Sequence, residues 1–326
     1  MSAQSSRSWD LKNIILQKIK EDGGWVNAHA HFDRAFTITP ETLPTASAHL
    51  HEKWKLVNEI KKASTIEEIY DRMAYAGQHM IKQGVSAVGT FIDVDEVITD
   101  KAIKAASKFR DAFKKDLKII YINQPVTGVL SKEARKWFDE AAEFVDVIGG
   151  LPGKDAPHED EHIDVLLSTA KKMGKMVHVH VDQLNSAKEK ETELLTDKTI
   201  AHGMEGKVVA VHAISIAAHP LAYRQKLYQK MKAAGIMVIC CPIAWIDGKR
   251  TEELAPTHNS ITPVEEMVAN EITVAIGTDN IADLYKPFAL GDMWEELHVL
   301  LEALKFYDID SLVKIATING RKVLGL

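Results

Sequence analysis

Two histidines spaced two residues apart are the first feature of this sequence that could do chemistry. His29 and His31 stand at the end of the short apolar run 25–30, just before a polar segment. In a β-strand, side chains at positions i and i+2 point to the same face, so both imidazoles would project together and could bind one metal ion. Because the chain has 14 histidines, such a pair can also arise by chance, and the metal hypothesis needs support from other segments.

The chain around this pair alternates between short apolar runs and longer amphipathic runs. The Val/Ile-rich runs predict buried parallel strands, and the runs between them predict helices. We expect strands at residues 25–30, 85–92, 117–122, 145–151, 176–181, 208–213, 236–241 and 272–277. We expect helices at residues 9–19, 51–62, 66–83, 96–114, 132–144, 163–173, 187–202, 220–234, 264–269, 293–305 and 309–324.

Eight strand–helix units predict an α/β protein built as a single (β/α)8 TIM barrel. The alternative, a doubly wound open sheet, would carry a glycine-rich phosphate loop after an early strand, and the sequence has none. We assign residues 1–23 to an N-terminal helical extension and residues 24–326 to the barrel.

The composition excludes several classes of protein. A net charge of −6 without a long basic run argues against a nucleic-acid partner. The only cysteines, Cys240 and Cys241, are adjacent and cannot form a disulfide framework, which favours a reducing compartment. Neither a signal-type core nor a run of about 18 apolar residues is present. We therefore expect a cytoplasmic protein without a membrane partner; the oligomeric state is left open.

Polar side chains gather at the predicted strand ends, where TIM barrels place their active sites. The fifth strand ends in His180 and Asp182, the sixth in His212, and the eighth in Asp279. Together with the first histidine pair, these residues would surround one mouth of the barrel. Imidazoles and carboxylates are common ligands of catalytic metal ions, so the sequence predicts a metal site there.

With these motifs, the chain resembles the amidohydrolase superfamily, and within it the cytosine deaminase branch, from about Val26 to Leu324. The matching motifs are His29-x-His31, His180-x-Asp182, the single His212, Thr278-Asp279-Asn280, the segment Thr90-Phe91-Ile92-Asp93-Val94, and Gln124 followed by Gly128-Val129-Leu130-Ser131.

The resemblance implies one divalent metal ion, zinc or iron, held by His29, His31, His180 and Asp279. It also implies that His212 lies beside the attacking water and the substrate, and that Gln124 contacts a ring amide. Three neutral imidazoles and a carboxylate leave an open position at which a metal can activate water. Asp279 could then shuttle the proton, and His212 could steady the developing charge.

Two positions depart from the branch. A glutamate that protonates the ring nitrogen is expected three residues after the strand-five metal histidine, where this chain has Gln183. An amide can hydrogen-bond but cannot give up a proton. Asn280 likewise replaces a second aspartate that would bind the substrate. Both changes indicate a different substrate or a different proton path. We also expect the family's small β-sandwich to be absent, with the N-terminal helix covering the barrel bottom instead.

Three further residues could have either a structural role or a functional one. His178 points into the same layer as His180, and a packed structural role is favoured over orientation of a ligand. Lys154 could be a carboxylated bridge between two metals or a plain loop lysine. Arg34 could meet an anionic substrate group or pair with an acid such as Asp33.

The leading functional expectation is a metal-dependent amidohydrolase that acts on a small cyclic amide or amidine. Its catalytic residues would be His212, Asp279 and Gln183, and its substrate-binding residues Gln124 and Asn280. Hydrolytic deamination is favoured, and hydrolysis of a ring amide is the alternative. A third possibility is a barrel that binds a ligand without turnover, having lost the acid at position 183.

Overall fold

The computed structural model describes residues 8–47, 50–184, 186–246 and 261–326. Eight strands in this part of the chain form two parallel sheets, in the orders β1–β2–β3 and β4–β5–β6–β7–β8. Their bounds are β1 Trp25–Ala30, β2 Val85–Asp93, β3 Lys118–Gln124, β4 Ile148–Gly150, β5 Val177–Val181, β6 Val208–His212, β7 Met237–Cys240 and β8 Val274–Ile276. The predicted α/β class with parallel strands in chain order is confirmed.

The two sheets meet at both of their edges. Ile122 of β3 bridges to Val147, and Ala30 of β1 bridges to Asp279, which follows β8. Within the described residues each junction holds only such an isolated bridge, whereas strands inside each sheet pair over several residues. The absence of a β-sandwich and the division at residue 23 stay predictions.

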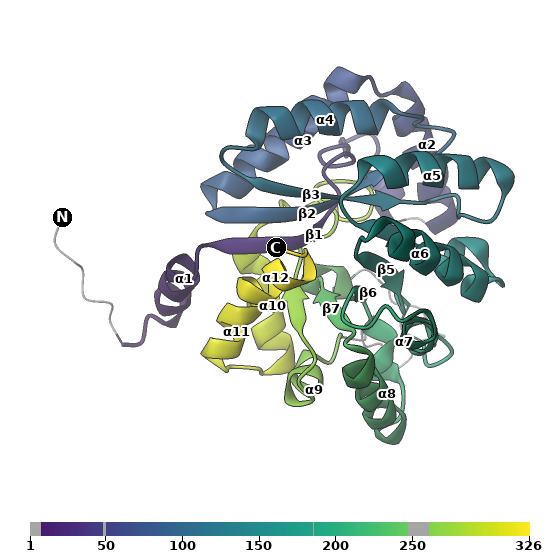
Figure 1. The fold of residues 1–326 in the computed structure, drawn as a ribbon. Helices are drawn as coiled ribbons and strands as arrows, with labels where there is room; N and C mark the ends of the chain where they lie inside the picture. The colour runs from purple at the N-terminus through teal and green to yellow at the C-terminus, as the bar shows by residue number, and fades with distance from the viewer. Residues whose placement is uncertain (1–7, 48–49, 185, 247–260) are drawn as a thin grey trace, which may run out of the picture.

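Helices follow the strands and surround both sheets (Figure 1). They are α1 Leu11–Glu21, α2 Leu50–Ala63, α3 Ile66–Lys82, α4 Lys101–Phe113, α5 Lys132–Phe144, α6 Glu159–Met173, α7 Glu191–His202, α8 Leu221–Ala234, α9 Val264–Ala269, α10 Met293–Leu304, α11 Ile309–Ala316 and α12 Ile318–Val323. Short 3-10 helices η1 Leu43–Ser47, η2 Pro152–Asp155, η3 Ile214–Ala218 and η4 Pro242–Ile246 complete the connections. None of the described helices is both long and apolar enough to span a membrane.

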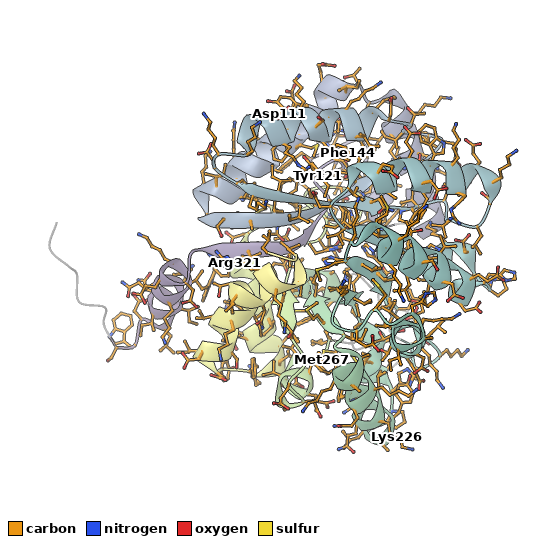
Figure 2. The ribbon with its side chains drawn as sticks, in the orientation of Figure 1. Asp111, Tyr121, Phe144, Lys226, Met267 and Arg321 are labelled. Carbon is orange, nitrogen blue, oxygen red and sulfur yellow. The ribbon has the colours of Figure 1, made fainter. Side chains whose placement is uncertain are left out.

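Side chains that alternate along the strands pack on two sides. On the outside, Tyr121 of β3 stacks on Phe144 of α5, with ring centroids 5.5 Å apart (Figure 2). On the inside, apolar residues of most strands form a second buried cluster, which includes Val26, Phe91 and Val211. This double burial explains why the strands read as continuous apolar runs.

The end of this interior nearest the start of the strands is filled by α12. Val323 and Leu324 belong to the interior cluster, and Gly320 approaches Val26 so closely that a Cβ would lie 2.6 Å from the Cβ of Val26. We expected the N-terminal helix to cover this end, but α1 packs beside α11, where Lys18 pairs with Asp310 at 2.8 Å. The expectation was wrong because Val323 and Leu324 near the C-terminus already occupy this end of the interior.

Candidate metal centre and its cavity

Four histidines and one aspartate meet at the carboxyl ends of β1, β5, β6 and β8. The Nε2 atoms of His29 and His31 both lie 3.2 Å from Oδ1 of Asp279. Ligand atoms of His29, His180 and His212 also lie within 4.8 Å of one another. The structure therefore brings together the whole predicted ligand set, with His212 as a close neighbour.

An irregularity in β1 aims the two histidines inward. Val26 and Ala28 belong to the interior cluster, whereas Ala30 belongs to the outer one. The pairing with β2 shifts between Asn27 and Ala30, so one extra residue reverses the alternation, as a β-bulge does. As a result His29 and His31 face the same side as Val26 and Ala28.

Asn27 anchors this irregular stretch to the last strand. Its Nδ2 donates to Thr278 Oγ1 at 2.8 Å, and the backbone N–H of Thr278 donates back to Asn27 Oδ1 at 3.1 Å. The backbone N–H of Asp279 donates to the carbonyl of His29 at 2.9 Å. These contacts fix the histidine pair relative to Asp279. Sequence reasoning missed Asn27, although a buried amide inside an apolar strand is an unusual signal.

Two of the converging residues have left-handed backbone conformations. His212 has φ of 72° and Asp279 has φ of 57°, a region that side chains other than glycine seldom adopt. Asp182 at the end of β5 shares this conformation with φ of 51°. Such strain persists where the surroundings dictate it, and it gathers at functional sites.

The charge states of these groups suit a divalent cation. Burial lowers the pKa of His29 to about 3 and the pKa of His180 well below its ordinary value, so both imidazoles are neutral. Burial acts to raise the pKa of Asp279, but its hydrogen bonds with His29 and His31 outweigh burial and hold it well below the ordinary value. A carboxylate among neutral imidazoles supplies the donor set that zinc or iron takes.

The remaining ring nitrogens are consistent with this use. His180 Nδ1 lies 3.3 Å from the carbonyl of Gly150, an arrangement that commonly orients a metal-binding imidazole. The Nδ1 atoms of His29 and His31 are buried without a hydrogen-bond partner among the described residues. His178 differs, because its Nε2 lies 2.8 Å from the carbonyl of Val323 at the α12 end. Its favoured structural role therefore has a defined partner.

A cavity of about 540 Å³ opens over this centre. Gln124, Gln183 and Asn280 all line it, as do His31, His180, His212 and Asp279. Gln124 Oε1 is buried and has no partner among the described residues. Asn280 Nδ2 donates to Asp283 Oδ2 at 2.5 Å, so part of its amide is already engaged. Gln183 is exposed to the cavity.

Two acids that the sequence analysis missed also line the cavity, Glu189 and Glu191. Glu191 Oε2 accepts from the backbone N–H of Asp182 at 2.9 Å, and Asp182 Oδ1 accepts from the N–H of Glu191 at 2.8 Å. Burial raises the pKa of Glu191 to about 7, and the negative charges of Asp182 and Glu189 add to the effect. The helix predicted over 187–202 includes both glutamates, whereas α7 begins only at Glu191.

Cations reach the cavity from another side. Arg34 follows the histidine pair, Lys154 lies in η2, and Lys61 comes from α2. Lys61, which sequence reasoning missed, pairs with Asp95 and lies 3.2 Å from Asp93. Arg34 pairs with Asp93, with Nη1 and Oδ1 3.6 Å apart, so its acidic partner is Asp93 and not the adjacent Asp33. Nothing in the sequence pattern linked α2 to the strand ends, because helix positions are not ordered by strand register.

Comparison with known proteins agrees with this arrangement. A model of the Amidohydrolase family matches residues 24–326. A Haemophilus influenzae protein named only as uncharacterized is 51% identical over 262 residues, which is 79% of this chain and 95% of that protein. N-isopropylammelide isopropyl amidohydrolase of Pseudomonas sp. is 25% identical, covering 93% of this chain and 74% of its own length. The crystal structure of 5-methylcytosine deaminase from Klebsiella pneumoniae with 5-fluorocytosine superposes with a TM-score of 0.85 at 24% identity, covering 93% and 74% of the two chains.

Proposed function

The chain belongs to the amidohydrolase family and is therefore a hydrolase of carbon–nitrogen bonds, and we propose that it deaminates a small cyclic amidine with one zinc or iron ion. The observation that carries this proposal is the meeting of His29, His31, His180 and Asp279 at one end of the strands. The name of the structural neighbour, 5-methylcytosine deaminase, supports deamination as the reaction. The scaffold in this proposal is a closed (β/α)8 barrel, supported by the bridges at both sheet junctions.

The protein side chains have separable roles in this reaction. His29, His31, His180 and Asp279 would hold the ion, which when bound lowers the pKa of water and polarises the carbon under attack. Asp279 would accept the proton of the attacking water at a carboxylate oxygen. His212, close to His29 and His180, would donate or accept a hydrogen bond at the developing oxyanion.

Amide side chains would orient the ring. Gln124 Oε1 is free to accept an N–H of a ring amide. Asn280 would present its carbonyl oxygen, because Asp283 occupies its Nδ2. Gln183 would hydrogen-bond to the substrate from the mouth of the cavity without transferring a proton.

One observation favours a second reaction, hydrolysis of a ring amide. The cavity presents an amide at Gln183 where deamination in the resembling branch uses a glutamate to protonate the ring. A reaction that opens the ring needs no ammonia to leave. The two reactions are distinguished by their products, since deamination releases ammonia and ring opening adds water to the substrate without such release.

The test is a substrate screen on protein loaded separately with zinc and with iron. The panel contains cytosine, 5-methylcytosine, pterins and cyclic ureides, and ammonia release and product mass are measured together. We expect turnover of at least one amidine with release of ammonia, and loss of that turnover after chelation. Ring-opened product without ammonia would select the second reaction. Metal-loaded protein that converts no member of the panel would contradict the proposal.

A further inference from the structure

The cation-bearing side of the cavity is not explained by deamination of a neutral ring. We call Arg34, Lys61 and Lys154 the basic wall. All three line the cavity together with His31 and His180, yet they come from the loop after β1, from α2 and from η2. Three segments far apart in the sequence therefore place positive charge next to the metal centre, which a neutral base does not need.

The charges of the basic wall are not fully balanced. Asp93 is the carboxylate that lines the cavity beside it, and Asp95 pairs with Lys61 behind it. Counted over these five residues alone, three cations face two carboxylates, which leaves about one positive charge on this side of the cavity. Such an excess at a cavity wall draws a monoanionic group and is small for a dianion.

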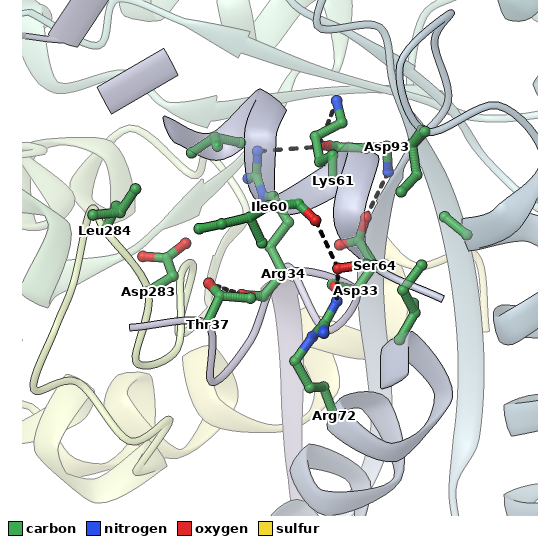
Figure 3. A pocket seen from close by; sticks show the side chains of 14 residues that line it. Asp33, Arg34, Thr37, Ile60, Lys61, Ser64, Arg72, Asp93, Asp283 and Leu284 are labelled. Atoms are coloured by element: carbon green, nitrogen blue, oxygen red, sulfur yellow. Dashed lines mark hydrogen bonds and ion pairs between the residues drawn. The ribbon is translucent and has the colours of Figure 1, made fainter. Parts of the chain in front are cut away.

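Further acids lie behind the wall around a separate cavity of about 20 Å³, which has room for one water molecule (Figure 3). Asp33 and Asp283 line it, and so does Arg72. Arg72 is a cation among these acids, and burial raises the pKa of Asp283, so the acids behind the wall cancel its positive charge only in part.

Arg34 is the member of the wall whose donors are least used. Its side chain is 13% exposed, and the Asp93 oxygen lies 3.6 Å from Nη1, beyond hydrogen-bond distance. Within the described residues its guanidinium makes no hydrogen bond, and its Nε is buried without a partner. Its other contact is with the ring of Tyr285, 5.7 Å away. A guanidinium has five donors in a fork that matches a carboxylate, so this side chain is arranged to receive an acceptor from the cavity.

Lys154 lies in the field of the same charges. Its pKa is lowered to about 8, chiefly by burial and then by Lys61 and Arg34, while Asp93 acts in the opposite direction. An anion placed between Lys154 and Arg34 would relieve this repulsion. Both side chains line the same cavity, which gives an anion access to them.

We propose that the substrate carries a carboxylate, or a monoanion of similar size, that binds between Arg34 and Lys154 while the ring faces the metal centre. This inference rests on the proposed function, because it names the substrate class for the same site. The acidic residues Glu189 and Glu191 line another part of the cavity. An anionic substituent would meet carboxyl groups there and cations at the basic wall, so the ring would bind in one orientation.

The test measures binding of matched product-like probes by calorimetry. The probes are uracil-5-carboxylate and uracil-6-carboxylate, the two corresponding carboxamides, and the corresponding phosphonates. Zinc-loaded wild-type protein should bind at least one carboxylate about 10–100-fold more tightly than its carboxamide, because hydrogen bonds to charged groups are the stronger ones. Tighter binding of the phosphonate would replace the monoanion with a dianion and overturn the charge argument.

Variants and metal removal locate the preference. Arg34→Gln should reduce the preference for the carboxylate over the carboxamide to about unity, and Lys154→Gln should reduce it severalfold. The Lys154→Gln variant carries the test if Arg34→Gln does not fold. Arg135→Gln on exposed α5, where Arg135 pairs with Asp139, is the control and should keep the preference. The preference should also persist after the metal is stripped. Its loss on stripping would mean that the carboxylate binds the metal, which overturns the proposal.

The result is separable from the deamination test. A preference for carboxylates without any ammonia release would contradict the proposed function and leave the basic wall as an anion site. Ammonia release from neutral rings by a protein that binds carboxamides as well as carboxylates would contradict only the anionic substrate. Tighter binding of the carboxamide would show that Asp93, accepting an N–H, governs this side of the cavity.

Discussion

Two sides of the same cavity accommodate buried like charges in different ways: the basic wall, and an acidic loop, which is the segment after β5 that carries Glu189 and Glu191. Arg34 cannot lose its proton under ordinary conditions, so its side keeps positive charge and balances it with Asp93 and Asp95. Glu189 and Glu191 have raised pKa values because burial favours the protonated carboxyl. Arg34 is therefore permanently charged, whereas Glu191, with a pKa of about 7, can gain or lose a proton near neutral pH. The difference indicates binding on the first side and proton exchange on the second.

Removal of the metal centre between the two sides should have the largest effect on activity. His180→Asn should abolish metal binding and lower turnover by about 10³-fold or more, because the water to be activated would return toward its ordinary pKa. Metal content by mass spectrometry and ammonia release measure the two effects. The matched control is His178→Asn on the same strand, whose side chain reaches Val323 instead. It should keep its metal, and equal losses in both variants would contradict the assignment.

An acid added to the acidic loop tests whether proton exchange belongs to that side. Gln183→Glu places a carboxyl at the mouth of the cavity, and general acid–base assistance typically contributes about 10²–10⁴-fold. If the native reaction needs only a hydrogen bond there, the variant should be slower on the native substrate. If the amide has disabled a deaminase, the variant should gain deamination of cytosine-type rings. Rates on a panel of cyclic amidines at matched metal content measure this. Unchanged rates throughout would remove Gln183 from the reaction path.

The smallest expected effect is on stability, and it tests whether Glu191 on the acidic side changes its charge near neutral pH. The pKa of Glu191 is about 7 in the folded protein against an ordinary value of 4.5. The folded state therefore binds more protons than the unfolded chain between these values. Its contribution to stability is full below pH 4.5 and is lost as pH rises through about 7. Ionisation of Glu191 should lower the free energy of unfolding of the wild type by about 2–3 kcal/mol between pH 4.5 and 8. The Glu191→Gln variant should not show this decrease.

Urea unfolding of wild type and variant at several pH values measures that difference. Glu193→Gln is the control, because Glu193 lies two residues along α7 and its pKa is lowered: burial acts to raise it, but hydrogen bonds from Lys230 and Tyr223 outweigh burial. It should give no gain in stability at alkaline pH. A wild type and Glu191→Gln variant with parallel pH profiles would mean that Glu191 ionises normally.

The sequence predicted the strand ends better than the segments between them. His29, His180, His212 and Asp279 could be found because parallel strands bring their carboxyl ends together whatever the connecting helices do. Strand bounds were also close, with β1 and β5 differing by no more than one residue from expectation. The fourth strand was expected over 145–151 but forms only at Ile148–Gly150.

Features that depend on tertiary packing were not predictable from spacing. The last helix was expected over 309–324, but it breaks at Thr317, where φ is −131° and ψ −91°, so that α12 can enter the interior. Lys61 reaches the cavity through the placement of α2, which no local pattern encodes. The reversal of alternation in β1 was also hidden, since a bulge changes the facing of residues without changing their order.

That irregular stretch limits how this centre could be transplanted into another protein. In a regular strand, Val26 and His29 would face opposite sides, so copying the motif into an ideal barrel strand would turn either the apolar residues or the ligands outward. A recipient would need the extra residue between Asn27 and Ala30 and a neighbouring threonine to match Asn27, as Thr278 does here. The portable unit is therefore the pair of strands joined by Asn27 and Thr278, because a graft of Val26 to His31 into a regular strand should turn either the apolar residues or the histidine pair away from the interior.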